Sequence, residues 1–122
     1  MKYLKDENLQ DLSKKIYEII NRVNIELNWN TKAETMVGQA KILATDLIRI
    51  NRFNKLTFEQ INDSFYEGVR DDDKDKFMNI PTYFKWIRKH KKRINEAISQ
   101  VEYLNKDPKQ VEYYPNNQKL LK

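Results

Sequence analysis

The chain has 122 residues, of which 39% are hydrophobic and 34% are charged, and its formal net charge is +5. This length fits a single domain, because one hydrophobic core commonly forms in about 100–150 residues. Two glycines and three prolines are too few for the many tight turns of an all-β fold. The absence of cysteine excludes disulfides, thiolate metal sites and cysteine nucleophiles.

No membrane-spanning pattern is found in the sequence. No apolar run approaches the roughly 18 residues that cross a bilayer. The first residues, MKYLKDE, lack the apolar stretch of a secretory signal. We therefore predict no membrane partner and a cytoplasmic location.

Two helices are predicted in the first half of the chain. Over residues 8–27, apolar side chains recur at steps of three and four and form one helical stripe. Residues 28–30 interrupt this pattern, because asparagine competes with helical backbone bonds. The second helix is expected over 31–53, with a capping box at residues 31–34. Its apolar residues cover a wider arc, which predicts a central helix with contacts on more than one side.

A third helix is predicted over residues 57–67. Thr57 and Gln60 form the clearest capping box in the chain, with Leu56 and Ile61 placed as a hydrophobic staple across it. Gly68 is expected to end this helix, because glycine readily adopts the backbone conformation of a helix C-terminus.

The last helix is expected from Ile80 to Leu104, with Pro81 in its first turn, where a missing amide costs nothing. The acidic residues before it, 71–76, are predicted either as a solvated loop or as the start of a short helix ending at Met78. The apolar stripe of the last helix consists of Ile80, Phe84, Ile87, Ile94, Ile98 and Val101. The predicted fold is therefore all-α: a bundle of four main helices in one domain, residues 1–104, followed by an irregular tail, residues 105–122.

The last helix accounts for the net positive charge, because the chain without its six clustered cations sums to about −1 (+5 − 6). Six of the nine residues from 85 to 93 are lysine or arginine, and none is acidic. At about 100° per residue, four of them share an outward arc opposite Ile87. We call these four residues the basic ridge: Lys85, Arg88, Lys89 and Lys92. Such a ridge matches the phosphates of a nucleic-acid backbone, where charge neutralisation releases counterions.

Trp86, His90 and Arg93 lie along one edge of this arc, where a ring or a guanidinium is placed to stack on a base or to pack on a sugar. The candidate nucleic-acid-binding residues are Lys85, Trp86, Arg88, Lys89, Lys92 and Arg93. Three other interpretations of the cluster stay open: a solvated face, an acidic protein partner, and the acidic segment 71–75 of the same chain. The near-neutral second half of the helix is expected to anchor it in the bundle while the cationic first half meets a partner.

Residues 56–93 carry a resemblance in the runs LTFEQI (56–61), FYEGVR (65–70) and FMNIPTYFKWI (77–87). A helix, a short helix, a turn at Asn79 and a basic helix resemble a tri-helical helix-turn-helix domain, whose last helix enters the major groove. The pattern is also similar to small helical accessory proteins of phages and mobile elements, some of them associated with DNA replication. The resemblance covers about a third of the chain. It implies a DNA-proximal role in replication or helicase recruitment, in the host cytoplasm.

Two departures argue against a sequence-specific repressor. Pro81 makes the turn before the last helix unusually short or strained. At the start of that helix, Thr82, Tyr83 and Lys85 are the side chains available to read bases.

The sequence shows no pattern of an active site, so we predict that the protein is not an enzyme and has no catalytic residue, cofactor or metal. His90 is the only histidine, which excludes a histidine metal cluster. Asp71, Asp73 and Asp75 imitate a calcium loop, but Lys76 and Thr82 occupy the positions that need glycine and glutamate. Glycines are isolated, so no phosphate-binding loop is present.

Two functions follow. The first is a non-enzymatic accessory protein that binds nucleic acid, DNA before RNA, through the basic ridge. The alternative is a structural or adaptor protein whose helices pack against a protein partner or against a second copy. Aromatic residues favoured in interface cores are its candidate contacts: Trp29, Trp86, Tyr113 and Tyr114.

Overall fold

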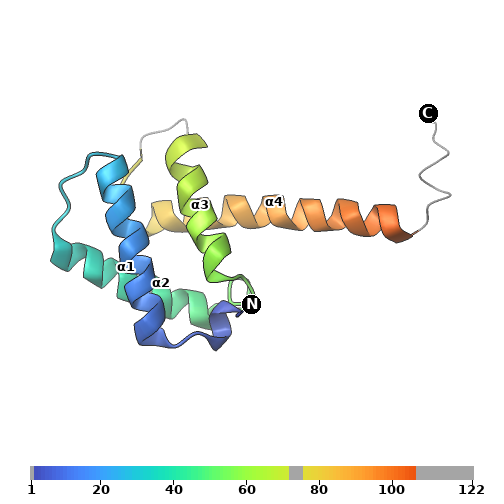
Figure 1. The fold of residues 1–122 in the computed structure, drawn as a ribbon, viewed down its shortest axis with the longest axis horizontal. Helices are drawn as coiled ribbons and strands as arrows, with labels where there is room; N and C mark the ends of the chain where they lie inside the picture. The colour runs from blue at the N-terminus through green and yellow to red at the C-terminus, as the bar shows by residue number, and fades with distance from the viewer. Residues whose placement is uncertain (1, 72–75, 107–122) are drawn as a thin grey trace. The chain divides into compact units, whose positions relative to one another are not determined.

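The computed structural model describes residues 2–71 and 76–106, and side chains up to residue 103. Its elements are a short 3-10 helix, η1 (Leu4–Asp6), and four α-helices, α1 (Leu9–Glu26), α2 (Ala33–Arg49), α3 (Phe58–Asp71) and α4 (Ile80–Lys106). Strand-like pairing in the described part is limited to a single bridge between Tyr3 and Thr57. The predicted all-α fold with four main helices is confirmed (Figure 1).

By its internal contacts the chain divides into two units, residues 1–90 and residues 91–122. Helix α4 belongs to the first unit up to His90 and to the second from Lys91. It extends past the expected domain end at Leu104. Most of the expected tail, with Tyr113 and Tyr114, lies outside the described residues, so the division into 1–104 and 105–122 stays a prediction.

Helix α1 begins and ends where asparagines favour it. The Asn8 side chain accepts hydrogen bonds from the amides of Gln10 and Asp11, which caps the first turn. At the other end, Asn28 has a left-handed backbone with φ of 57°. The Trp29 amide donates to the Asn24 carbonyl at 2.9 Å. This pattern is a Schellman motif, in which asparagine replaces the usual glycine, and it confirms the predicted break at residues 28–30.

The core of the first unit lies between α1 and α2, which cross in Figure 1, while α3 lies beside α1. Each fully buried aliphatic side chain stabilises the fold by about 1.5–3 kcal/mol. The buried residues of these two helices include Leu12, Ile16, Ile20, Val23, Leu43, Ala44 and Leu47. The N-terminal segment adds Leu4, which is fully buried and whose amide donates to the Leu56 carbonyl at 2.8 Å.

Two predictions about α2 are wrong. The capping box at residues 31–34 does not form, since the helix begins after Lys32 and no side chain caps it. The helix is also shorter than expected and ends at Arg49. Part of its apolar surface is not covered, since Val37 and Ile42 are 40% and 53% exposed.

Helix α3 starts with the predicted capping box. Gln60 Oε1 accepts from the Thr57 amide at 2.9 Å, and Thr57 Oγ1 accepts from the Gln60 amide at 3.3 Å. Gly68 does not end the helix, which continues to Asp71. Its role is packing: a Cβ at Gly68 would lie 2.2 Å from Cγ of Trp86.

Helix α4 is capped by Asn79, whose Oδ1 accepts from the Thr82 amide at 2.9 Å, with Pro81 in the first turn as predicted. Residues 76–79 are not helical, so no short helix reaches Met78. Residues 72–75, most of the acidic segment, lie outside the described residues. The helix-turn-helix arrangement of residues 56–93 is therefore not confirmed.

Candidate nucleic-acid interface

The first stretch of α4, residues 80–90, is held by aromatic packing. The Tyr83 and Trp86 rings lie 5.1 and 5.6 Å from the Phe65 ring, centroid to centroid. Phe84 packs on Phe53 at 5.5 Å. Such ring pairs add about 0.5–1.5 kcal/mol each beyond the area they bury. This stretch is therefore a rigid part of the first unit.

Trp86 is 2% exposed, with its ring against Gly68 and Phe65. The prediction that this ring is offered to a base or sugar does not fit its burial. The sequence places Trp86 beside the basic ridge. The ring turns inward because Gly68 has no side chain and leaves space for it against α3.

Polar contacts fix the same stretch of helix. The Tyr83 hydroxyl donates to Gln39 Oε1 at 2.8 Å, and Gln39 Nε2 donates to the Met78 carbonyl at 2.8 Å. Burial raises the pKa of the Tyr83 hydroxyl, because the phenolate form is disfavoured away from water. Gln39 thus connects α2 both to the beginning of α4 and to the segment before it.

In the first unit, the predicted cations face outward to different degrees. Arg88 and Lys89 are exposed, and Lys85 is half-buried. Next to them, the half-buried His90 has its Nδ1 2.8 Å from Oε1 of Glu67 in α3. This contact links α4 to α3 at the end of the first unit.

In the second unit, Lys92 and Arg93 are exposed and Lys91 is half-buried. Within residues 2–71 and 76–103, neither Arg88 nor Lys89 nor Lys92 forms an ion pair. An acidic counterpart from the same chain is therefore not seen for these three cations in the described part.

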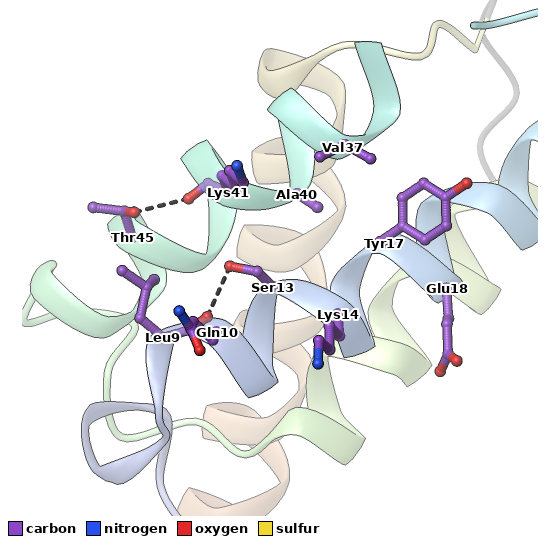
Figure 2. A pocket seen from close by; sticks show the side chains of 10 residues that line it. All are labelled: Leu9, Gln10, Ser13, Lys14, Tyr17, Glu18, Val37, Ala40, Lys41 and Thr45. Carbon is purple, nitrogen blue, oxygen red and sulfur yellow. Dashed lines mark hydrogen bonds between the residues drawn. The ribbon is translucent and has the colours of Figure 1, made fainter. Parts of the chain in front are cut away.

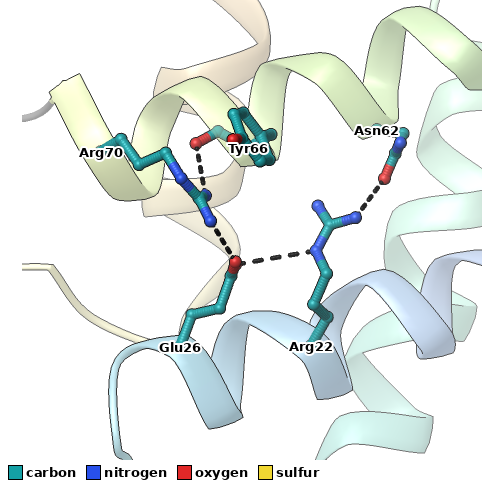
Figure 3. Close-up of polar contacts among 5 residues, drawn as sticks. All are labelled: Arg22, Glu26, Asn62, Tyr66 and Arg70. Carbon is teal, nitrogen blue, oxygen red and sulfur yellow. Dashed lines mark hydrogen bonds and ion pairs between the residues drawn. The ribbon is translucent and has the colours of Figure 1, made fainter.

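Other cations of the first unit have structural roles. Glu26 at the end of α1 lies between two arginines (Figure 3): Arg22 Nε is 3.6 Å from Oε1, and Arg70 Nη2 donates to Oε2. This hydrogen bond raises the pKa of Arg70. Arg70 also stacks on Tyr66, 3.6 Å from the ring centroid. The cluster joins α1 to α3. Because Glu26 and Arg70 are 44 residues apart, no local pattern in the sequence predicts their pairing.

A groove of about 850 Å³ lies between α1 and α2 (Figure 2). Its apolar lining includes Leu9 and Val37, which are 47% and 40% exposed although they belong to the apolar patterns of the helices expected over residues 8–27 and 31–53. The hydroxyls of Ser13 and Thr45 donate to backbone carbonyls of their own helices, at 2.7 and 2.8 Å. The groove therefore offers apolar surface, and both hydroxyls are engaged by backbone carbonyls.

The described residues contain no cluster of three or more histidine, cysteine or acidic side chains that could hold a metal ion. In the same part of the chain, no helix combines the length and apolar character required to cross a bilayer.

No match to this chain is found among models of protein families, among curated proteins or among solved structures. The residues themselves must therefore carry any assignment.

Proposed function

We propose that this protein is a non-enzymatic nucleic-acid-binding accessory protein that contacts backbone phosphates through the basic ridge of α4. The observation that carries the proposal is that Arg88, Lys89 and Lys92 are exposed and form no ion pair within the described residues. Lysines that only solvate a helix are commonly interspersed with acids. Here residues 85–93 contain none.

The buried position of Trp86 shapes the proposal. Without an exposed ring in this stretch, base stacking has no aromatic partner there, and the contacts that we propose are to phosphates, which carry no sequence information. We therefore expect binding with little sequence preference. A preference for DNA, a setting in phage or mobile-element replication and a host-cytoplasmic location rest on the resemblance over residues 56–93.

The test is the salt dependence of binding. Four phosphate contacts give a slope of about −3 to −4 for log K against log salt concentration. Anisotropy of labelled duplex and single-stranded oligonucleotides, measured between low and physiological salt, gives this slope. Arg88→Glu with Lys92→Glu is expected to abolish binding, and circular dichroism should show an unchanged helix content because both side chains are exposed.

Lys32→Glu with Lys41→Glu is the matched control, because both lysines are exposed, Lys32 at the N-cap of α2 and Lys41 within it, and the net charge changes equally. This control should retain most of the affinity. The proposal fails if the wild-type protein does not bind at low salt, if binding does not depend on salt, or if the control loses as much affinity as the ridge variant.

The adaptor alternative is favoured by a different observation, the exposure of apolar side chains on α2 and on the second stretch of α4. Trp29, one of its candidate contacts, is 45% exposed and partly covered by Phe77, with ring centroids 6.2 Å apart. In this alternative the cations of α4 would meet an acidic protein surface.

A further inference from the structure

The second stretch of α4, residues 91–103, is helical but almost uncovered. From Lys92 to Tyr103 every residue except Ile94 is exposed, and Ile98 and Val101 are 50% and 56% exposed. Isolated helices of about 12–15 residues are marginally stable in water. Most helix stability in proteins comes from packing an amphipathic face, so covering the apolar face of this stretch would stabilise it.

That face is one continuous stripe. Ile94, Ile98 and Val101 follow one another at steps of four and three, so they align along the helix. We call these three residues the α4 stripe. Ala97, beside it, lines a shallow hollow together with Ile98 and Val101. The small alanine leaves space for the backbone of a second helix to approach closely.

The charges around the α4 stripe differ between its two ends. Lys91, with Arg93 farther round the helix, lies at the N-terminal end, and Glu102 lies at the C-terminal end. A parallel copy of the helix would set the cations of one chain against the same cations of the other. An antiparallel copy sets each cationic end beside the acidic end of the other chain, which is favourable.

We propose that two copies of this chain pair through the α4 stripe as an antiparallel, two-fold symmetric dimer. In this register Ile94 packs against Ile98 of the second copy, and the reverse contact repeats across the axis. The aliphatic stem of Lys91 covers Val101 of the second copy and extends its ammonium toward Glu102 there. Ala97 lies near the axis in both chains.

The dimer does not depend on the proposed nucleic-acid binding. On the helix, Lys92 and Ser99 lie about 130–150° from the centre of the α4 stripe, at about 100° per residue. Pairing therefore leaves the exposed cations of α4 accessible. The dimer is tested without nucleic acid. It can therefore be disproved while the proposed function holds, and the proposed function can be disproved while the dimer holds.

Light scattering measures the assembly directly. At about 100 µM, well above a micromolar Kd suited to so short an interface, the wild-type protein is expected to be dimeric. Ile98→Asp should give a monomer, whereas Ser99→Asp, the adjacent residue facing away from the stripe, should remain a dimer. A wild-type monomer at this concentration would overturn the proposal, as would equal loss of the dimer in both variants.

Disulfide trapping then tests the orientation, because the chain has no cysteine of its own. An equimolar mixture of Lys91→Cys and Val101→Cys should form a disulfide-linked heterodimer on oxidation. Val101→Cys alone should not, since an antiparallel dimer places the two copies of position 101 about 15 Å apart along the axis. Rapid self-crosslinking of Val101→Cys would indicate a parallel pair and would overturn the antiparallel arrangement.

Discussion

The two stretches of α4 have the same amphipathic pattern and opposite burial. In residues 80–90, Tyr83, Trp86 and Ile87 are at most 2% exposed. In residues 91–103, Ile98 and Val101 are 50% and 56% exposed. The expectation that the cationic first half meets a partner while the second half anchors the helix is therefore wrong about the anchor. A stripe shows that a helix has an apolar face, but not which surface covers it.

A large effect is expected where the first stretch of α4 packs on α3. Gly68→Ala gains up to about 1 kcal/mol of helix propensity, but its Cβ would lie 2.2 Å from Cγ of Trp86. The ring or α3 must shift, and overpacking of this kind costs about 1–3 kcal/mol or more. We expect urea denaturation, followed by tryptophan fluorescence, to show a net loss of about 2 kcal/mol.

The matched control for this variant is the other glycine. A Cβ at Gly38, in the middle of α2, meets nothing within 4 Å. Gly38→Ala is therefore expected to raise the free energy of unfolding by up to about 1 kcal/mol. If both alanines stabilise the protein, the close packing of Trp86 on α3 is wrong.

A smaller effect is expected at the polar contact of the same stretch. Tyr83→Phe removes the hydroxyl that donates to Gln39 at 2.8 Å, which costs about 1 kcal/mol. Burial also raises the pKa of Tyr83 above its ordinary value of 10.0. The folded state therefore keeps the phenol proton where the unfolded chain loses it, and this contribution to stability is lost as the pH rises above about 10.

The measurement is the difference in unfolding free energy between wild type and Tyr83→Phe across this range. The difference should be constant from pH 7 to 9 and narrow above pH 10. A constant difference up to pH 11 would show that Tyr83 ionises as readily in the folded protein as in the unfolded chain.

Local signals in the sequence predicted the helices well. Thr57 and Gln60 form the expected capping box, and Asn28 ends α1 where the pattern breaks. These features depend on residues within one turn of each other, so spacing alone reveals them. At residues 31–34 the expected capping box does not form, and the Thr31 amide donates instead to Asn24 Oδ1 at 3.1 Å.

The candidate site was harder to predict because it depends on contacts between distant elements. Arg88, Lys89 and Lys92 are exposed as the helical wheel predicted. Trp86 lies on the same helix, but its orientation is decided by the space above Gly68 in α3. The open faces at Val37 and Ile98 were missed for the same reason, since periodicity does not reveal how much surface the remaining helices can cover.

The smallest expected effect lies in the second stretch, where Ile98→Ser changes an exposed side chain. At low protein concentration, where the chain is monomeric, we expect it to shift the unfolding free energy by less than about 0.5 kcal/mol. Ile87→Ser is the matched substitution on the same face of α4, at a residue that is 1% exposed, and it should cost about 3 kcal/mol or more. Urea denaturation of both variants compares the two stretches directly. Equal losses would mean that the second stretch is buried in the monomer, and the contrast between the two parts of α4 would then disappear.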